Sequence, residues 1–239
     1  MFSREISSRR GKINIIGAGR TDAGVHAYGQ VANFHTNSDW DAEKITHALN
    51  AILPCDIAVR KTADVPDNFH ARFDATARQY TYRMVTRKSP ISRHFAALFH
   101  YQFSIDSMNA ASGCLVGKKS FKSFAKKSDE RHNFVCDVKK AEWKLDTGYR
   151  DRESIISFPS SGIQPKVHMI LFEIEADRFL HGMVRAIVGT LVDIGRGKIS
   201  IEDFKKILVS EDRTMASMTV PACGLCLEEV KYGFDLWNR

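Results

Sequence analysis

The chain has 239 residues, of which 44% are hydrophobic, enough for one or two compact domains with a real core. Lysine and arginine total 35 against 28 acidic residues, and the net charge of +7 favours an anionic partner such as nucleic acid. No apolar run approaches membrane-spanning length, and the start has no signal-peptide pattern, so we expect a cytoplasmic protein that does not associate with membranes. The odd number of cysteines, five, fits a reducing compartment.

A glycine-rich segment from Gly17 to Ala27 places Asp22 in a predicted turn between two predicted strands, residues 13–16 and 28–34. Glycines accept left-handed backbone angles, so the turn can hold the carboxylate open to a substrate. A dinucleotide-binding turn is the first alternative, but Asp22 stands where its third glycine belongs and no helix pattern follows. The second alternative is an Asx turn, in which Asp22 bonds only its own backbone.

Further along the first half, Ser38 or Asp39 is expected to cap a helix that ends at Pro54. Residues 56–60 read as a strand, residues 65–73 as a loop, and residues 78–84 as a strand with Tyr80 and Tyr82 on one face. A helix with Ile105, Met108 and Leu115 is expected to stop at Gly117. We place a domain boundary near residue 104, which divides the chain into subdomains 1–104 and 105–239.

The second half again mixes strands with helices. Strands are predicted over residues 133–145, around Ile170, Phe172 and Ile174, and over residues 220–232, with a loop at residues 159–165. A helix from about 178 to 194 would put His181, Arg185 and Gly189 on a side away from its apolar stripe, and Ser200 would cap another helix. This order predicts an α+β fold built around a mixed, mainly antiparallel sheet flanked by helices.

Two weaker patterns concern possible binding groups. Basic clusters occur at residues 9–12, 118–119, 126–127 and 139–140, and Phe121 and Phe124 beside them slightly favour an RNA contact over an ordinary solvated surface. Cys223 and Cys226 have zinc-like spacing, but there is no second pair. We therefore expect core thiols and no metal site.

The chain resembles the TruA-type tRNA pseudouridine synthases over nearly its whole length. The strings that carry the resemblance are Gly-Arg-Thr-Asp-Ala-Gly-Val-His-Ala at 19–27, Asn-Phe-His-Ala-Arg-Phe at 68–73, Ala-Arg-Gln-Tyr-Thr-Tyr at 77–82, Phe-Leu-His-Gly-Met-Val-Arg-Ala-Ile-Val-Gly at 179–189, and Gly-Leu-Cys-Leu at 224–227.

The resemblance implies the pseudouridine synthase fold, with two subdomains around a central cleft, and isomerisation of uridines in the tRNA anticodon stem-loop, positions 38–40. Such an enzyme is a tRNA-binding homodimer that needs no cofactor. Asp22 would be the catalytic carboxylate, and whether it attacks the base, attacks the sugar or abstracts a sugar proton stays open. Arg185 would pair with it.

The other site residues follow from the same strings. Tyr80 would stack on uracil and help the late deprotonation of C5. Arg20 would fill the space left by the flipped nucleotide. Leu225 would line the base pocket, and Arg72 and Arg78 would contact the substrate. Gly189 is expected to admit the segment that carries Asp22. Loss of Arg185 would cost about 3–5 kcal/mol if the pair is buried.

Two departures from the family pattern matter. Members begin with a strand bearing Tyr-Asp-Gly and a nearby Gly-Trp-Gln, followed by a helix that leads to the catalytic strand. Neither string occurs here, so we expect residues 1–8 to be the tail of that helix. Around Phe121 and Phe124 the chain has Lys119-Ser120 and Ala125 in place of the family's His-Asp and Arg. The alternative function is therefore a shortened, inactive RNA-binding protein.

Overall fold

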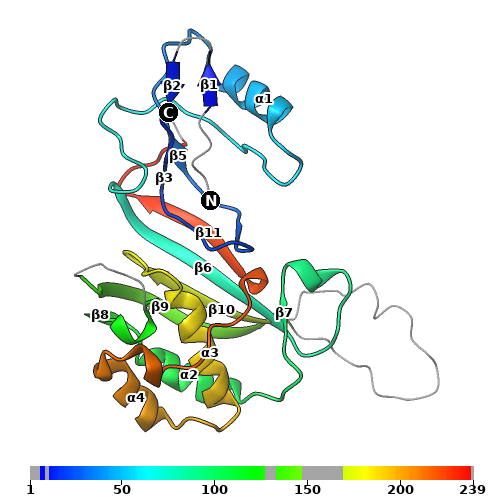
Figure 1. Ribbon diagram of the computed structural model, residues 1–239, viewed down its shortest axis with the longest axis vertical. Helices are drawn as coiled ribbons and strands as arrows, with labels where there is room; N and C mark the ends of the chain where they lie inside the picture. Colours follow the sequence, from blue (N-terminus) through cyan, green and yellow to red (C-terminus); the bar gives the residue numbers. More distant parts are fainter. Residues whose placement is uncertain (1–5, 9–10, 127–132, 147–168, 238–239) are drawn as a thin grey trace, which may run out of the picture. The chain divides into compact units, whose positions relative to one another are not determined.

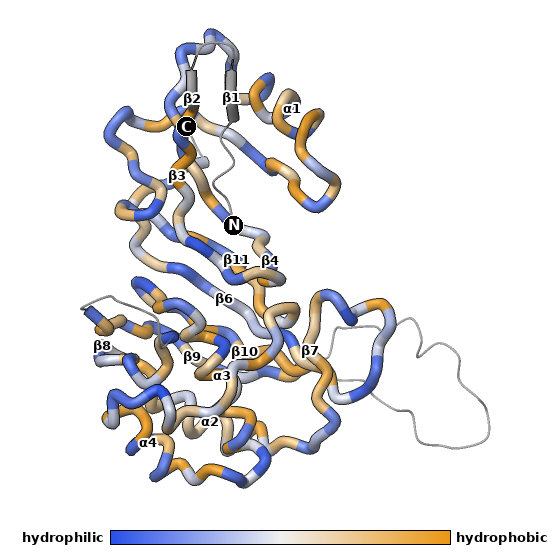
Figure 2. The backbone as a smooth tube through the Cα atoms, viewed as in Figure 1, coloured by the Kyte–Doolittle hydropathy of each residue, from blue (hydrophilic) through white to orange (hydrophobic). Residues whose placement is uncertain are grey.

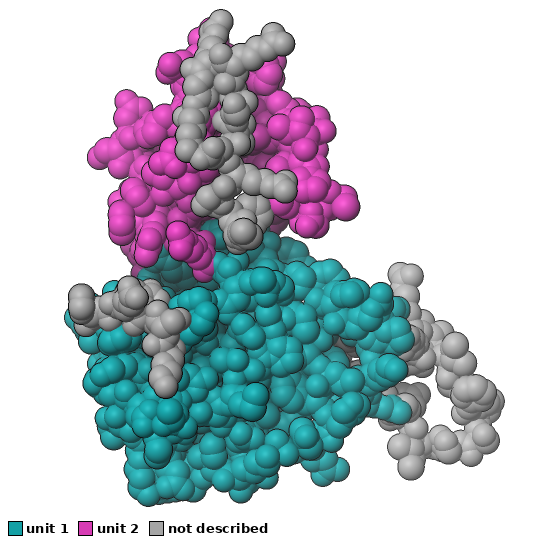
Figure 3. Space-filling model, in the orientation of Figure 1, with its two compact units in different colours: residues 1, 21–30, 77–230 teal, residues 2–20, 31–76, 231–239 magenta. Residues whose placement is uncertain are grey.

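The computed structural model describes residues 6–8, 11–126, 133–146 and 169–237. The chain divides into two compact units (Figure 3). Unit 1 contains residues 21–30 and 77–230, and unit 2 contains residues 2–20, 31–76 and 231–239. Residue 104, where we placed a boundary, lies inside unit 1. The loop predicted at residues 159–165 lies outside the described residues.

A seven-stranded sheet organises unit 1 (Figure 1). Its strands follow the order β4 (His26–Ala27), β11 (Leu225–Tyr232), β6 (Ala75–Val85), β10 (Met169–Ala176), β9 (Val135–Asp146) and β8 (Gly117–Ser120), with β7 (Ala97–Leu98) on β6. Strand β10 is antiparallel to both β6 and β9, and β9 is antiparallel to β8. Strands β4 and β7 are parallel to β11 and β6. The predicted α+β class with a mainly antiparallel sheet is confirmed.

The helices of unit 1 lie together on one face of this sheet, as Figure 1 shows. They are α2 (Ile105–Gly113), α3 (Met183–Gly195) and α4 (Ile201–Ser210). Along β10 the side chains of Ile170, Phe172 and Ile174 enter the core, whereas Glu173 and Glu175 on the other face do not. Figure 2 shows the hydropathy of these elements along the backbone.

Short 3-10 turns link these elements: η1 (Ser92–His94), η2 (Lys122–Phe124), η4 (Arg213–Met215) and η5 (Ala222–Gly224). Phe121 and Phe124, at η2, are completely buried in the core. The predicted RNA contact by these two rings is therefore wrong, because they are needed to fill the space beneath α3 and α4.

Unit 2 contains the hairpin of β1 (Ile6–Ser8) and β2 (Gly11–Ile13), the pair β3 (Ile16–Gly17) and β5 (Ala32–Asn33), and helix α1 (Ala42–Ile52). Asn33 is buried and binds the backbone of both Phe69 and Ala71. Tyr232 donates its hydroxyl to the carbonyl of Ala71. Asn33 and Tyr232 therefore hold the backbone of the 68–73 segment in place. Among the described residues no helix is long and apolar enough to cross a membrane.

Several element predictions need correction. Residues 6–8 form a strand, so the expected helix tail is wrong there, and residues 1–5 lie outside the described part. The cap of α1 is Asp41, which accepts from the amide of Lys44, rather than Ser38 or Asp39. Residues 56–60 are not a strand. Helix α2 ends at Gly113, before Gly117. The predicted Ser200 cap is confirmed by its bond from the amide of Asp203.

Candidate active site

Asp22 lies in a tight turn between β3 and β4. The amide of Val25 donates to the carbonyl of Asp22 at 3.1 Å, and Gly24 has a φ of +83°. A positive φ at the third position of such a turn favours glycine, which explains why glycine stands there. The backbone closes the turn, and the Asp22 side chain points to other partners. The Asx-turn alternative is therefore wrong, and so is the dinucleotide turn, because a strand follows.

The Asp22 carboxylate is held by two cationic or donor side chains, one at each oxygen. Arg185 Nη1 lies 2.7 Å from Oδ2, and His181 Nε2 lies 3.0 Å from Oδ1. The side chains of Asp22 and Arg185 are 20% and 21% exposed, whereas that of His181 is 50% exposed. The pairing of Arg185 with Asp22 expected from the resemblance is present. The site thus has a shielded arginine and a more exposed histidine on one carboxylate.

Arg185 is aimed by the backbone as well as by the carboxylate. Its Nε donates to the carbonyl of Val220 at 2.8 Å, and the amide of Val220 donates to the carbonyl of Arg185 at 3.3 Å. Gly189, one turn along α3, permits this approach because a Cβ there would overlap the carbonyl oxygen of Met218. The expectation that Gly189 admits the Asp22 segment is wrong, since the segment against it is 218–220.

His181 was not among the predicted site residues. The sequence reading extended the helix back to residue 178, but α3 begins at Met183, and Gly182 caps it with a φ of +73°. His181 therefore lies in the turn before the helix, where its carbonyl accepts from the amide of Lys126 at 3.0 Å. The only signal in the sequence was its place four residues before Arg185 in the same string.

Tyr80 and Tyr82 share a face of β6 but differ in their surroundings. Tyr82 is fully buried, and its hydroxyl donates to the carbonyl of Pro221, so it is a core residue. Tyr80 is half-buried and packs edge-on against Phe179, with ring centres 5.2 Å apart. Burial raises the pKa of Tyr80 to about 12; Arg78 opposes this rise, and the charge of Asp22 adds to it. Tyr80 therefore lies in the electrostatic reach of the carboxylate.

The remaining predicted residues divide between the two units. Leu225 is buried and belongs to the same hydrophobic cluster that Tyr80 and Phe179 pack against. Arg78 donates to the carbonyl of Asp177 at 2.7 Å. Arg20 and Arg72 belong to unit 2 and are exposed, and the guanidinium of Arg72 lies 5.7 Å from the ring centre of Phe73.

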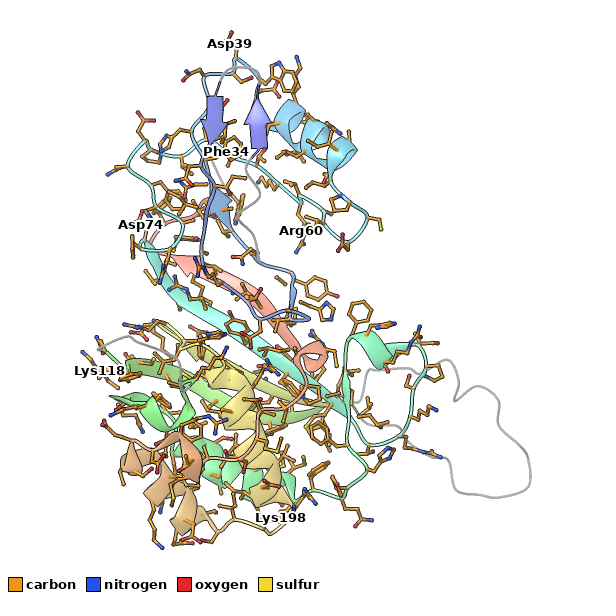
Figure 4. The ribbon with its side chains drawn as sticks, viewed as in Figure 1. Phe34, Asp39, Arg60, Asp74, Lys118 and Lys198 are labelled. Atoms are coloured by element: carbon orange, nitrogen blue, oxygen red, sulfur yellow. The ribbon has the colours of Figure 1, made fainter. Side chains whose placement is uncertain are left out.

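The predicted basic clusters and the cysteine pair have ordinary surroundings where they are described. Lys118 on the edge strand β8 is exposed (Figure 4), and so is Lys126. Lys140 is engaged by Glu142 and Glu173. Within the described ranges Cys223 and Cys226 are free thiols, and no group of histidine, cysteine and acidic side chains could hold a metal. The expected core setting holds for Cys226, which is buried.

Comparison with known proteins adds independent evidence. A family model described as tRNA pseudouridine synthase matches residues 1–74 and 111–233. Proteins named tRNA pseudouridine synthase A are similar to the chain. The one from Bacteroides fragilis is 39% identical over 94% of this chain and 82% of its own length. Those from Thermoanaerobacter pseudethanolicus and Porphyromonas gingivalis are 39% and 37% identical over 92% and 95% of this chain, and 83% and 84% of their own lengths. The chain therefore belongs to the tRNA pseudouridine synthase family.

Proposed function

We propose that this protein isomerises uridine in tRNA to pseudouridine, with Asp22 as the catalytic carboxylate and the anticodon stem-loop, positions 38–40, as the target. The observation that carries the proposal is the fixed carboxylate, held at Oδ2 by Arg185 within a turn that exposes it at the surface of unit 1. Family membership and the +7 net charge support an RNA substrate.

The reaction breaks the N1–C1′ bond of the nucleotide, turns the uracil and joins C5 to C1′. It ends when the C5 proton is released to solvent and N1 gains a proton from solvent, so that no oxidant or cofactor is consumed. A carboxylate suits this chemistry because it can attack carbon or accept a proton, and a fixed cation favours its charged form. Arg185 supplies that cation.

The other residues act on the base and the surrounding RNA. Tyr80 offers an aromatic face for the extruded uracil. Its hydroxyl is neutral at pH 7, as the ordinary tyrosine pKa of 10.0 already requires, and burial raises this pKa further, to about 12. It therefore acts as a neutral donor toward the late intermediate. Leu225 provides an apolar wall. The positive charge of Arg78 acts on Tyr80, because it opposes the rise in the pKa of that hydroxyl. Arg20 and Arg72 contribute positive charge on unit 2, and the active species is a homodimer in the cytoplasm.

Exchange of Asp22 for asparagine tests the proposal. The substitution keeps the shape of the side chain but removes the charge, so tRNA binding should remain while turnover falls by at least about 100-fold. The assay uses tRNA transcripts labelled with tritium at uridine C5 and measures the tritium released to water. Turnover in Asp22→Asn equal to the parent would contradict the role of Asp22. Salt-sensitive binding with no tritium release by the parent protein would favour the inactive RNA-binding alternative.

A further inference from the structure

The hydrogen bond from Arg185 fixes only one of the two oxygens of the Asp22 carboxylate. Arg185 holds Oδ2 and is itself held by the Val220 carbonyl, so the position of this oxygen is fixed. The torsion that turns a carboxylate about its last bond is broad and nearly twofold in energy. A single hydrogen bond therefore leaves the plane of the group free to rotate, and Oδ1 would sweep through a range of positions.

His181 supplies the second anchor. Its Nε2 lies 3.0 Å from Oδ1, and both the neutral Nε2-protonated ring and the imidazolium can donate this bond. The backbone that carries it is also fixed, because the amide of Lys126 donates to the His181 carbonyl and Gly182 turns the chain into α3. The ring is thus presented from the turn before α3, whereas Arg185 comes from the helix itself.

The two donors differ in exposure, and this difference assigns different parts to them. The side chain of Arg185 is 21% exposed, whereas that of His181 is 50% exposed, so the histidine is the donor that solvent and substrate reach more easily. Each carboxylate oxygen thus has one side-chain donor, Arg185 at Oδ2 and His181 at Oδ1, and each keeps a lone pair for a nucleoside. With Arg185 fixing one oxygen, the donor at the other oxygen fixes the plane of the carboxylate and so the direction in which it meets its substrate.

We infer that His181 is a positioning residue that fixes the plane of the Asp22 carboxylate and so orients it toward the nucleotide, an inference that rests on the proposed uridine isomerisation. It acts through Asp22 and makes no covalent bond. A misplacement of about 1 Å at a reacting atom can cost about 100-fold in rate. Loss of this donor should therefore lower the rate of chemistry and leave the binding of tRNA unchanged.

Two substitutions at residue 181 distinguish a hydrogen-bonding role of the His181 side chain from a role in packing alone. His181→Phe keeps a ring but removes the donor, and we expect kcat to fall about 10-fold to 100-fold with KM for tRNA within about twofold of the parent. His181→Gln places an amide donor near the position of Nε2, and we expect it to recover most of kcat. His47, which pairs with Glu43 on α1, provides the matched controls His47→Phe and His47→Gln, both with parental kcat.

A second readout is independent of activity. In the nitrogen-15 spectrum of histidine-labelled protein, the Nε2 proton of His181 should be protected from exchange in the parent and lose that protection in Asp22→Ala. Kcat of His181→Phe equal to the parent, or no effect of Asp22→Ala on the His181 ring, would overturn the inference. If the parent releases no tritium, the proposed function fails, and the spectrum alone then decides whether His181 holds the carboxylate.

Discussion

At the scale of single residues, the central feature is the way Arg185 is shared between a carboxylate and a backbone carbonyl. Asp22 and Arg185 are each about one-fifth exposed, and His181 is a second donor to the carboxylate besides Arg185. The penalty for an unpaired charge is therefore smaller than the 3–5 kcal/mol expected for a fully buried pair. We expect Arg185→Ala to lower the free energy of unfolding by about 1–3 kcal/mol.

Urea unfolding measures that change, and Arg185→Lys sharpens the test. A lysine carries the charge but cannot bind both Oδ2 and the Val220 carbonyl in the fork geometry of a guanidinium. Arg185→Lys should therefore recover part of the stability and little of the tritium release. Full activity of Arg185→Lys would show that charge alone is sufficient and that the aim of the side chain is unimportant.

Tyr80 gives a prediction about pH. Burial raises its pKa to about 12, above the ordinary value of 10.0, so the folded protein favours the neutral phenol. This stabilisation is present below pH 10 and is lost as the pH rises toward 12. Because the Asp22 charge contributes to the rise, Asp22→Asn should lower the pKa of Tyr80. The difference in absorbance at the phenolate band between each protein and its Tyr80→Phe variant measures this, and an unchanged pKa would contradict it.

At the scale of elements, the approach of residues 218–220 to α3 depends on Gly189. A Cβ at residue 189 would overlap the Met218 carbonyl, so Gly189→Ala must displace either the helix or the segment that holds Arg185. We expect a loss of about 1–3 kcal/mol in the free energy of unfolding, together with lower turnover. Thermal and urea unfolding, with tritium release, measure both effects.

Gly113 is the matched control because it is the last residue of α2 and its added Cβ would meet no atom within 4 Å. Gly113→Ala should leave stability unchanged or raise it by about 0.5–1 kcal/mol through the lower flexibility of the unfolded chain. Equal losses in the two variants would contradict the assignment of the Gly189→Ala effect to the contact with Met218.

The elements also show what the sequence can predict. Alternation located β6, β9 and β10 because each strand has one face in a core, and capping located α4 at Ser200. The start of α3 was misplaced by several residues because Phe179 continues the apolar spacing although it lies in the preceding loop, against Tyr80. Phe121 and Phe124 were misread because neighbouring lysines do not reveal that a ring points inward.

The site was predictable to the same extent. The string around Asp22 and the arginine of α3 identified the carboxylate and its partner, which are 163 positions apart in the chain. The second partner, His181, was missed because its contact depends on the left-handed Gly182 and on the turn before α3. Such a contact arises from backbone geometry, which spacing in the sequence does not encode.

At the scale of the whole molecule, the net charge of +7 makes a prediction about binding. Each phosphate that is neutralised releases counterions, so four or more contacts should give a log–log slope of affinity against salt of about −3 or steeper. Binding of a tRNA transcript across a series of salt concentrations measures this slope. Lys118→Gln on β8 tests one exposed charge, and a slope shallower than about −1 would argue against a phosphate-dominated interface.

The contact between Val220 and Arg185 has a consequence for how this protein can vary. The acceptor that aims the guanidinium is a main-chain oxygen, which every amino acid possesses, so many side chains at residue 220 leave it in place. The number of residues between α4 and β11 is constrained, because an inserted or deleted residue would replace the Val220 carbonyl with another carbonyl, or with none, as the acceptor for Arg185 Nε. Natural variants should therefore tolerate amino-acid substitutions in the segment between α4 and β11 far better than insertions or deletions.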